Sequence, residues 1–258
     1  MRLMKRIMSV AAVLALSASL LVGCSSGTAS SVPVSASSAA ESTVSSVEET
    51  ASSAVDENEA AAAQLLNDLT GSYQELWPVI LADEYKQTWL DDCTALVGED
   101  NAEAAFEKLS SMVTGDVYGE DAVKAYANGG GAYFCGFTNS LATLTFDGET
   151  STISGTDKDG NVLFSHTYHY IGMEPVRGLY EFESDDADSG EFTYFFLAPD
   201  TSAETYHIEF RYGSDAEALS QYDAGEYAYW LASGISTDCD QTMIDNCIEL
   251  FCTENLAG

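Results

Sequence analysis

The sequence predicts an α+β fold, in which consecutive antiparallel strands curl into a barrel between N-terminal helices and a C-terminal helix. Apolar residues recur at helical spacing over about residues 72–126, alternate with polar residues over about 141–212, and return to helical spacing near the C-terminus. The turns between the expected strands are short and rich in Asp and Gly, which is typical of antiparallel neighbours. Six such strands in succession favour a closed sheet.

The helical part of this prediction begins at a capping-box pattern. Ser72-x-x-Glu75 precedes an apolar run, as it does where a helix starts. Pro78 would remove a backbone hydrogen bond inside such a helix and kink it. A second helix is expected over residues 102–113 and a short third one over residues 121–126.

The period of the apolar residues changes to two after residue 140. The expected strands are Leu141–Phe146, Thr150–Gly155, Asn161–Met173, Gly178–Ser184, Glu191–Leu197 and Thr205–Tyr212. A final helix is expected over about residues 238–253, with an apolar face that packs against the barrel.

The N-terminus has the pattern of a secretory signal. Basic residues precede an uncharged apolar run over residues 7–22, and this run is too short to span a bilayer. The run ends in Leu21-Val22-Gly23-Cys24, which resembles a bacterial lipobox. We therefore expect a signal peptide over residues 1–23 and lipidation of Cys24, which tethers the protein to the outer side of the cytoplasmic membrane. The alternative is an ordinary signal peptide followed by a chance cysteine.

Composition divides the rest of the chain into a tether and one domain. Residues 24–63 are dominated by Ser, Ala, Val, Thr and Glu, which bury too little apolar surface to fold, so a disordered tether is expected there. Residues 64–258 are expected to form one folded domain. The chain carries 42 acidic against 9 basic residues, so its surface repels nucleic acid and anionic lipid. Membrane contact is expected through the lipid anchor only.

Neither the cysteines nor the motifs indicate an enzyme. No Cys-x-x-Cys, Ser-x-x-Lys or His-Glu-x-x-His motif occurs, and no Gly-x-Ser-x-Gly motif occurs within residues 64–258, so no catalytic activity is expected. The five cysteines after Cys24 form an odd set, which leaves at least one thiol unpaired. They are Cys93, Cys135, Cys239, Cys247 and Cys252.

The strand Thr205–Tyr212 carries the candidate site. His207 and Glu209 are two residues apart, so their side chains project side by side from one face, a spacing suited to binding one metal ion. The alternative is a solvated polar face in which Glu209 pairs with Arg211 or with a cross-strand neighbour. His166 and His169 are three residues apart on a strand and therefore point to opposite faces.

Several motifs in order resemble the ZinT (YodA) family of zinc-binding domains. The resemblance rests mainly on the segments 177–183, 196–199 and 206–215, which read RGLYEFE, FLAP and YHIEFRYGSD. It extends back to the segments 146–148 and 72–78, the second of which is similar to the family's opening helix, and forward through the segment 226–230 to the final helix. The resemblance implies a lipocalin-like (calycin) barrel and an extracytoplasmic protein that helps supply zinc to an ABC-type importer.

The resemblance also implies where a metal ion would bind. The family holds zinc chiefly with three histidines, and its His-x-His pattern corresponds to His207-x-Glu209 in this chain. An earlier family histidine falls on Phe195. The implied ligands are therefore His207 and Glu209, for zinc or another divalent cation. The alternative is a calycin-like module with a decayed metal site that binds a small molecule or a partner protein.

Overall fold

The computed structural model describes residues 57–113, 117–127, 133–198 and 207–256. The expected signal peptide, Cys24, most of the expected tether and the first two residues of the strand Thr205–Tyr212 lie outside the described residues. Within the described part, no helix has the length and apolar character needed to cross a membrane.

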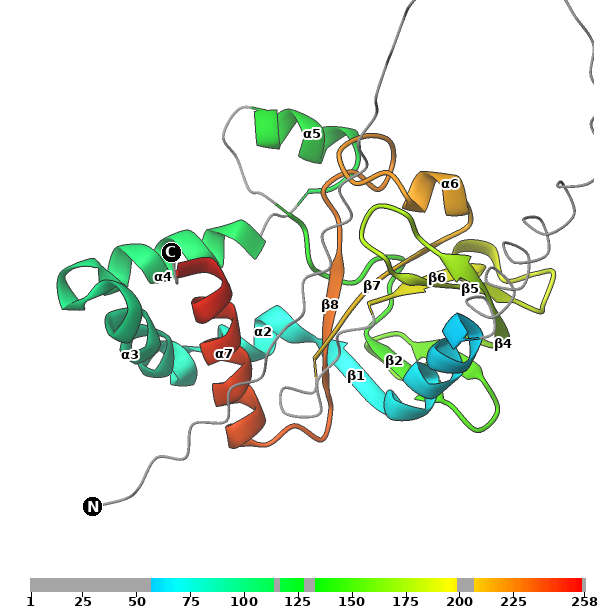
Figure 1. The fold of residues 1–258 in the computed structure, drawn as a ribbon, viewed down its shortest axis with the longest axis horizontal. Coiled ribbons are helices and arrows are strands. Elements are labelled where there is room, and N and C mark those ends of the chain that lie inside the picture. Colours follow the sequence, from blue (N-terminus) through cyan, green and yellow to red (C-terminus); the bar gives the residue numbers. More distant parts are fainter. Residues whose placement is uncertain (1–56, 114–116, 128–132, 199–206, 257–258) are drawn as a thin grey trace, which may run out of the picture. The chain divides into compact units, whose positions relative to one another are not determined.

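Eight antiparallel strands form a closed barrel in which each strand pairs with its neighbours in sequence and β1 pairs with β8 (Figure 1). This confirms the expected α+β barrel with helices on either side of it in sequence. The strands are β1 Gly71–Glu75, β2 Thr143–Asp147, β3 Thr152–Thr156, β4 Val162–Met173, β5 Tyr180–Ser184, β6 Tyr194–Leu197, β7 His207–Gly213 and β8 Ala232–Ser236.

Most of the expected helices are present, with shifted ends. A helix over residues 57–68 precedes the barrel and crosses the expected boundary between residues 63 and 64. The later helices are α2 Leu76–Ile80, α3 Lys86–Val97, α4 Glu99–Val113, α5 Glu120–Ala127, the short α6 Ala216–Leu219 and α7 Gln241–Leu256. Short 3₁₀ turns cover Asp83–Tyr85 and Gly190–Phe192.

The capping-box prediction at Ser72-x-x-Glu75 is wrong, because these residues form β1. The Ser72 hydroxyl hydrogen-bonds the Thr145 hydroxyl on the neighbouring strand at 2.8 Å, and Glu75 Oε1 accepts the backbone N–H of Phe137 at 2.6 Å. The helix α2 begins only at Leu76, so Pro78 lies in its first turn, where backbone N–H groups have no partner within the helix. Pro78 therefore causes no kink.

The interior of the barrel is filled by aromatic and aliphatic side chains. Strand β7 sends Ile208, Phe210 and Tyr212 into this core, and Phe195 of β6 stacks against Tyr212 with ring centres 5.4 Å apart. Because side chains alternate along a strand, the other face of β7, with His207 and Glu209, points away from the interior.

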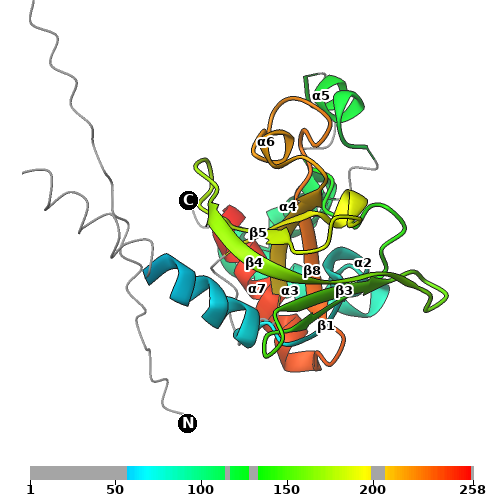
Figure 2. The same cartoon turned by 90° about the vertical axis from the view of Figure 1, so that its right-hand side faces the viewer.

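A second apolar core lies outside the barrel, between its wall and the helices. It unites α2, α3, α4 and α7, and Ile235 of β8 is part of it. Trp89 is completely buried there and donates its indole N–H to the Ile80 carbonyl oxygen at 2.7 Å. In Figure 1 the helices α3, α4 and α7 lie on one side of the barrel, and Figure 2 shows the strands in front of them. The outer face of β7 is thus turned toward the helical layer.

Candidate functional site

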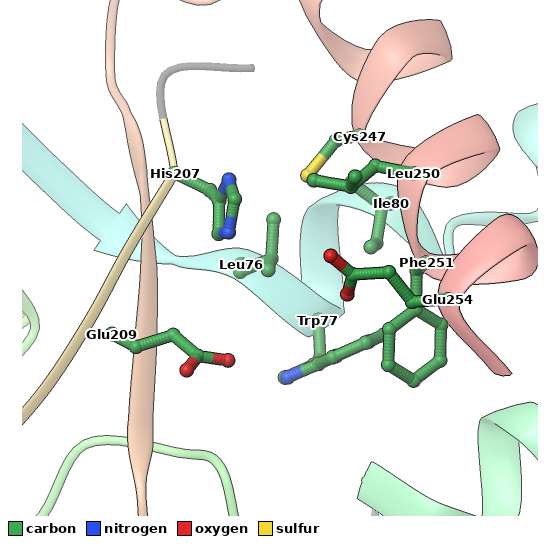
Figure 3. A pocket seen from close by; sticks show the side chains of 9 residues that line it. All are labelled: Leu76, Trp77, Ile80, His207, Glu209, Cys247, Leu250, Phe251 and Glu254. Carbon is green, nitrogen blue, oxygen red and sulfur yellow. The ribbon is translucent and has the colours of Figure 1, made fainter. Parts of the chain in front are cut away.

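A cleft opens between the outer face of β7 and the helices α2 and α7 (Figure 3). Its volume of 40 Å³ offers room for about two or three water molecules. His207 and Glu209 form the strand side of the cleft, and both are half-buried. The helical side consists of Leu76, Trp77 and Ile80 from α2 and of Cys247, Leu250, Phe251 and Glu254 from α7.

The structure brings His207 and Glu209 together on one face, as their spacing predicts. The alternative partner for Glu209, Arg211, has its guanidinium turned to backbone carbonyls instead, since it donates to Leu219 and Tyr227. His207 and Glu209 face a lined cleft rather than an open polar surface. Their position is therefore suited to holding a ligand between the barrel and the helical layer.

Glu254 is a third polar group of this cleft that sequence reasoning missed. Figure 3 shows its carboxylate directed toward the space that His207 and Glu209 also face. One signal was available, because Glu254 follows Cys247 and Phe251 at helical spacing and so continues the apolar stripe of the last helix. A carboxylate at the end of a buried stripe is a candidate functional residue. The side chain is exposed, so the cleft is open to solvent there.

These donors have the chemistry of a zinc site but not its closed geometry. One imidazole and two carboxylates are ligand types that zinc binds. Among the residues that the structure describes, no three His, Cys, Asp or Glu side chains lie close enough to hold one metal ion. Metal binding therefore requires His207, Glu209 and Glu254 to move toward one another.

A larger cavity of 270 Å³ adjoins the cleft along the same face of the barrel. The two spaces share Trp77, Glu209, Phe251 and Glu254 as lining residues. The larger cavity adds Met112, Val113, Tyr133, Cys135, Arg177, Leu231, Ser233 and Asn255. The two carboxylates therefore border both spaces, and one guanidinium borders only the larger one.

The thiols at the site remain protonated at neutral pH. Burial, and to a smaller extent the negative charge of nearby Glu209, raises the pKa of Cys135 to about 12. Burial likewise raises the pKa of Cys247 to about 12. The thiolate is the form that binds metal, and these two thiols are protonated. Cys135 and Cys247 therefore serve as core side chains and not as metal ligands. The available ligands are the imidazole and the carboxylates.

The other histidines lie elsewhere on the barrel. His166 Nδ1 lies 2.9 Å from Asp186 Oδ2, and His169 Nδ1 lies 2.8 Å from Asp185 Oδ1. His166 stacks on Phe164 along the inner face of β4, whereas His169 is exposed, so the two point to opposite faces, as predicted. Phe195 is completely buried inside the barrel and does not border the cleft.

The chain thus forms a closed antiparallel barrel, with a polar cleft between the outer wall of the barrel and the helices α2 and α7. No family model and no curated protein sequence matches the chain. Solved structures that are similar to it share little sequence identity with it. One is the Zn(II)-bound ZinT-like domain of Streptococcus pneumoniae AdcA, with a TM-score of 0.44, 15% identity and coverage of 70% of this chain and 87% of that chain.

Another is Zn(II)-bound AdcA from Streptococcus pneumoniae, with a TM-score of 0.41 and 14% identity. This match covers 73% of the present chain and 34% of the AdcA chain. TM-scores at this level do not support the transfer of residue roles. The roles proposed below therefore rest on the geometry of this chain alone.

Proposed function

We propose that the protein binds zinc or another divalent cation outside the cytoplasmic membrane and assists metal uptake or homeostasis. The observation that carries this proposal is the position of His207 and Glu209 on one face of β7, opposite Glu254 of α7, around a single cleft. A neutral imidazole and two carboxylates balance the charge of a divalent cation, and all three are ligands that zinc accepts.

The charge of the chain supports a cation as the ligand. With 42 acidic and 9 basic residues, the protein attracts cations and raises their concentration near its surface. Three protein ligands also leave a coordination position for water or another molecule, unlike a closed structural zinc site. Such an open site suits a cargo that is bound and released again.

Localisation and partner form part of the same proposal. The lipobox-like sequence ending at Cys24 supports a lipid-anchored protein on the extracytoplasmic side, where an ABC-type metal importer would accept its cargo. We propose a binding protein and not an enzyme. A Cys24→Ser variant should lose its lipid anchor and move to the aqueous phase in detergent partitioning, and a variant that stays with the membrane fraction would contradict the anchor.

Zinc titration of the metal-free chain against a chromophoric chelator tests the metal site. Wild type should bind one equivalent, and His207→Ala should abolish this binding without unfolding the domain, as circular dichroism would check. His166→Ala is the matched control, because its imidazole pairs with Asp186 and lines neither the cleft nor the larger cavity, and it should titrate like wild type. Identical titrations of wild type and His207→Ala would refute the site.

The dependence on pH and salt separates this site from diffuse binding by an acidic surface. Protons compete with the metal for an imidazole, so zinc affinity should fall as the pH drops through about 6.5, the ordinary range of histidine. Diffuse binding would involve many weak sites, would be suppressed by salt and would not respond to His207→Ala.

A module that binds a small molecule is the second candidate function. It is favoured by the adjoining 270 Å³ cavity, in which the buried indole nitrogen of Trp77 makes no hydrogen bond with the described residues. If wild type binds no zinc, binding of a small molecule replaces metal binding as the proposed function.

A further inference from the structure

We propose that the metal ion binds together with a small organic carboxylate, whose anionic group lies in the larger cavity between Arg177 and the indole N–H of Trp77. This inference rests on the proposed metal site and names the second component of its cargo. It goes beyond that site because it gives a role to a cavity that the metal ligands leave unexplained.

Trp77 supplies the first sign of a missing acceptor. Its side chain is 8% exposed, and its Nε1 is buried without a hydrogen-bond partner among the described residues. The thiol of Cys135 lies beside it, but a protonated thiol is only a weak acceptor. An unpaired buried donor is costly, so an acceptor inside the cavity would be stabilised there.

Arg177 supplies a positive charge at the same cavity. Within the described residues, no Asp or Glu forms an ion pair with its guanidinium, although the chain has 42 acidic residues. The guanidinium lies over the rings of Tyr133 and Tyr222, at 5.5 Å and 4.8 Å from their centres. It also donates to the Tyr133 hydroxyl at 3.2 Å. These contacts orient a fork of donors that suits a carboxylate.

The backbone beneath Arg177 is held by a buried carboxylate. Glu174 is completely buried, and its two oxygens accept the backbone N–H groups of Val176 and Arg177, each at 2.7 Å. The segment that carries the guanidinium is therefore anchored before any ligand arrives. A preorganised donor loses less entropy when it binds.

The charges around the cavity make an anion and a metal ion depend on each other. Glu209 and Glu254 carry two negative charges and Arg177 one positive charge, so the lining is net negative without metal. A divalent cation at the carboxylates reverses this sign and leaves one positive charge to neutralise. A monoanion is thus repelled from the empty site and attracted to the metal-loaded one.

The walls favour an organic anion over an inorganic one. Phe251, Leu231 and Val113 give the cavity apolar surface, and its volume of 270 Å³ exceeds what an inorganic ion alone would fill. Ligand sites of this kind combine apolar walls with a few placed polar groups. A carboxylate with a small carbon skeleton matches both features.

Zinc titration of the full chain with and without benzoate tests this inference, because benzoate itself binds zinc only weakly. Benzoate should raise zinc affinity at least about 5-fold, and zinc should raise benzoate affinity by the same factor, since binding couplings are reciprocal. Benzoate should therefore bind the metal-free chain more weakly than the zinc-loaded chain, by this same factor. Acetate should give a smaller effect and sulfate the least, because they lack the apolar body.

Two variants locate the effect. Arg177→Met should abolish the benzoate effect while the chain still binds one equivalent of zinc in its absence, and Trp77→Phe should weaken the effect because it removes only the N–H. Lys86→Met is the matched control, since this exposed lysine pairs with Glu103 on the surface, and it should keep the full effect.

The outcomes separate this inference from the metal proposal. If zinc binds through His207 but benzoate leaves its affinity unchanged, or if sulfate acts as strongly as benzoate, the carboxylate site is refuted while the metal site stands. An undiminished benzoate effect in Arg177→Met would also refute it. If zinc binds under neither condition, both proposals fail.

Discussion

Replacing Arg211 by Met should destabilise the domain more than any exposed charge does, because this guanidinium is completely buried. Its Nη1 donates to the carbonyl oxygen of Leu219, its Nη2 to that of Tyr227, and both reach that of Gln221 at 3.3 Å. It also lies 4.3 Å from the centre of the Tyr222 ring. Through these hydrogen bonds, the side chain of Arg211 on β7 holds the segment between β7 and β8 in place.

The magnitude follows from these contacts. A hydrogen bond to a charged group contributes about 1.5–3 kcal/mol, so the two closest bonds together contribute about 3–6 kcal/mol, and Met would leave three carbonyls without this donor. Burial disfavours the charged form of Arg211 and so lowers its pKa. Replacing the charged side chain therefore recovers part of the desolvation cost. We expect a net loss of about 3 kcal/mol, within the range for breaking a buried polar network.

Urea unfolding followed by circular dichroism measures this loss. Arg211→Lys should be intermediate, because one ammonium keeps the charge but lacks the fork that reaches three carbonyls. Arg177→Met is the control, since that guanidinium is exposed and lies over the same Tyr222 ring, and it should cost less than about 1 kcal/mol. A loss below about 1 kcal/mol in Arg211→Met would refute the reasoning.

Three further predictions follow from buried groups elsewhere. The pKa values of Cys135 and Cys247 lie at about 12 in the folded chain, against 9.0 for an exposed thiol. The free energy of unfolding should therefore fall as the pH rises from 9 to 12. It should fall less steeply in a variant in which both Cys135 and Cys247 are replaced by Ala. The sulfurs of Cys93 and Cys252 lie 3.9 Å apart, although the two residues are 159 positions apart in sequence. Oxidised glutathione added during refolding should join them in a disulfide and stabilise the domain by at most about 5 kcal/mol. Peptide mapping that finds both thiols free would contradict this. Glu174→Ala removes two acceptors under Arg177 and should cost about 2 kcal/mol in urea unfolding and weaken the benzoate effect, and an unchanged effect would show that this anchor is not needed.

Most strands could be predicted from the sequence because their signal is local. All six expected strands are present, since alternation and short turns lie within a few residues of each other. The two missed strands lack that signal. In β8, Ala232–Ser236, helices cover the outer face, so four consecutive residues are buried and no alternation exists. In β1 only Tyr73 is buried, and the strand depends on β2 and β8, which are distant in sequence.

The candidate site was predictable only where it lies on one element. His207 and Glu209 share a face because the period of a strand is two, which needs no knowledge of the rest of the fold. Trp77, Arg177 and Glu254 reach the same face from α2, from the turn after β4 and from α7. No local pattern connects these positions, because their meeting depends on how the helical layer packs against the barrel.

The packing also explains why the site lies outside the barrel. Phe192 stacks on Phe164 with ring centres 4.0 Å apart, and Phe195 stacks on Tyr212, so aromatic rings occupy the interior where a wider barrel would hold a ligand. The polar side chains of β7 are therefore left to the outer face, where the helical layer supplies the opposite wall. A ligand between these walls would contact β7 and α7 at once, so its binding energy would hold α7 against the barrel.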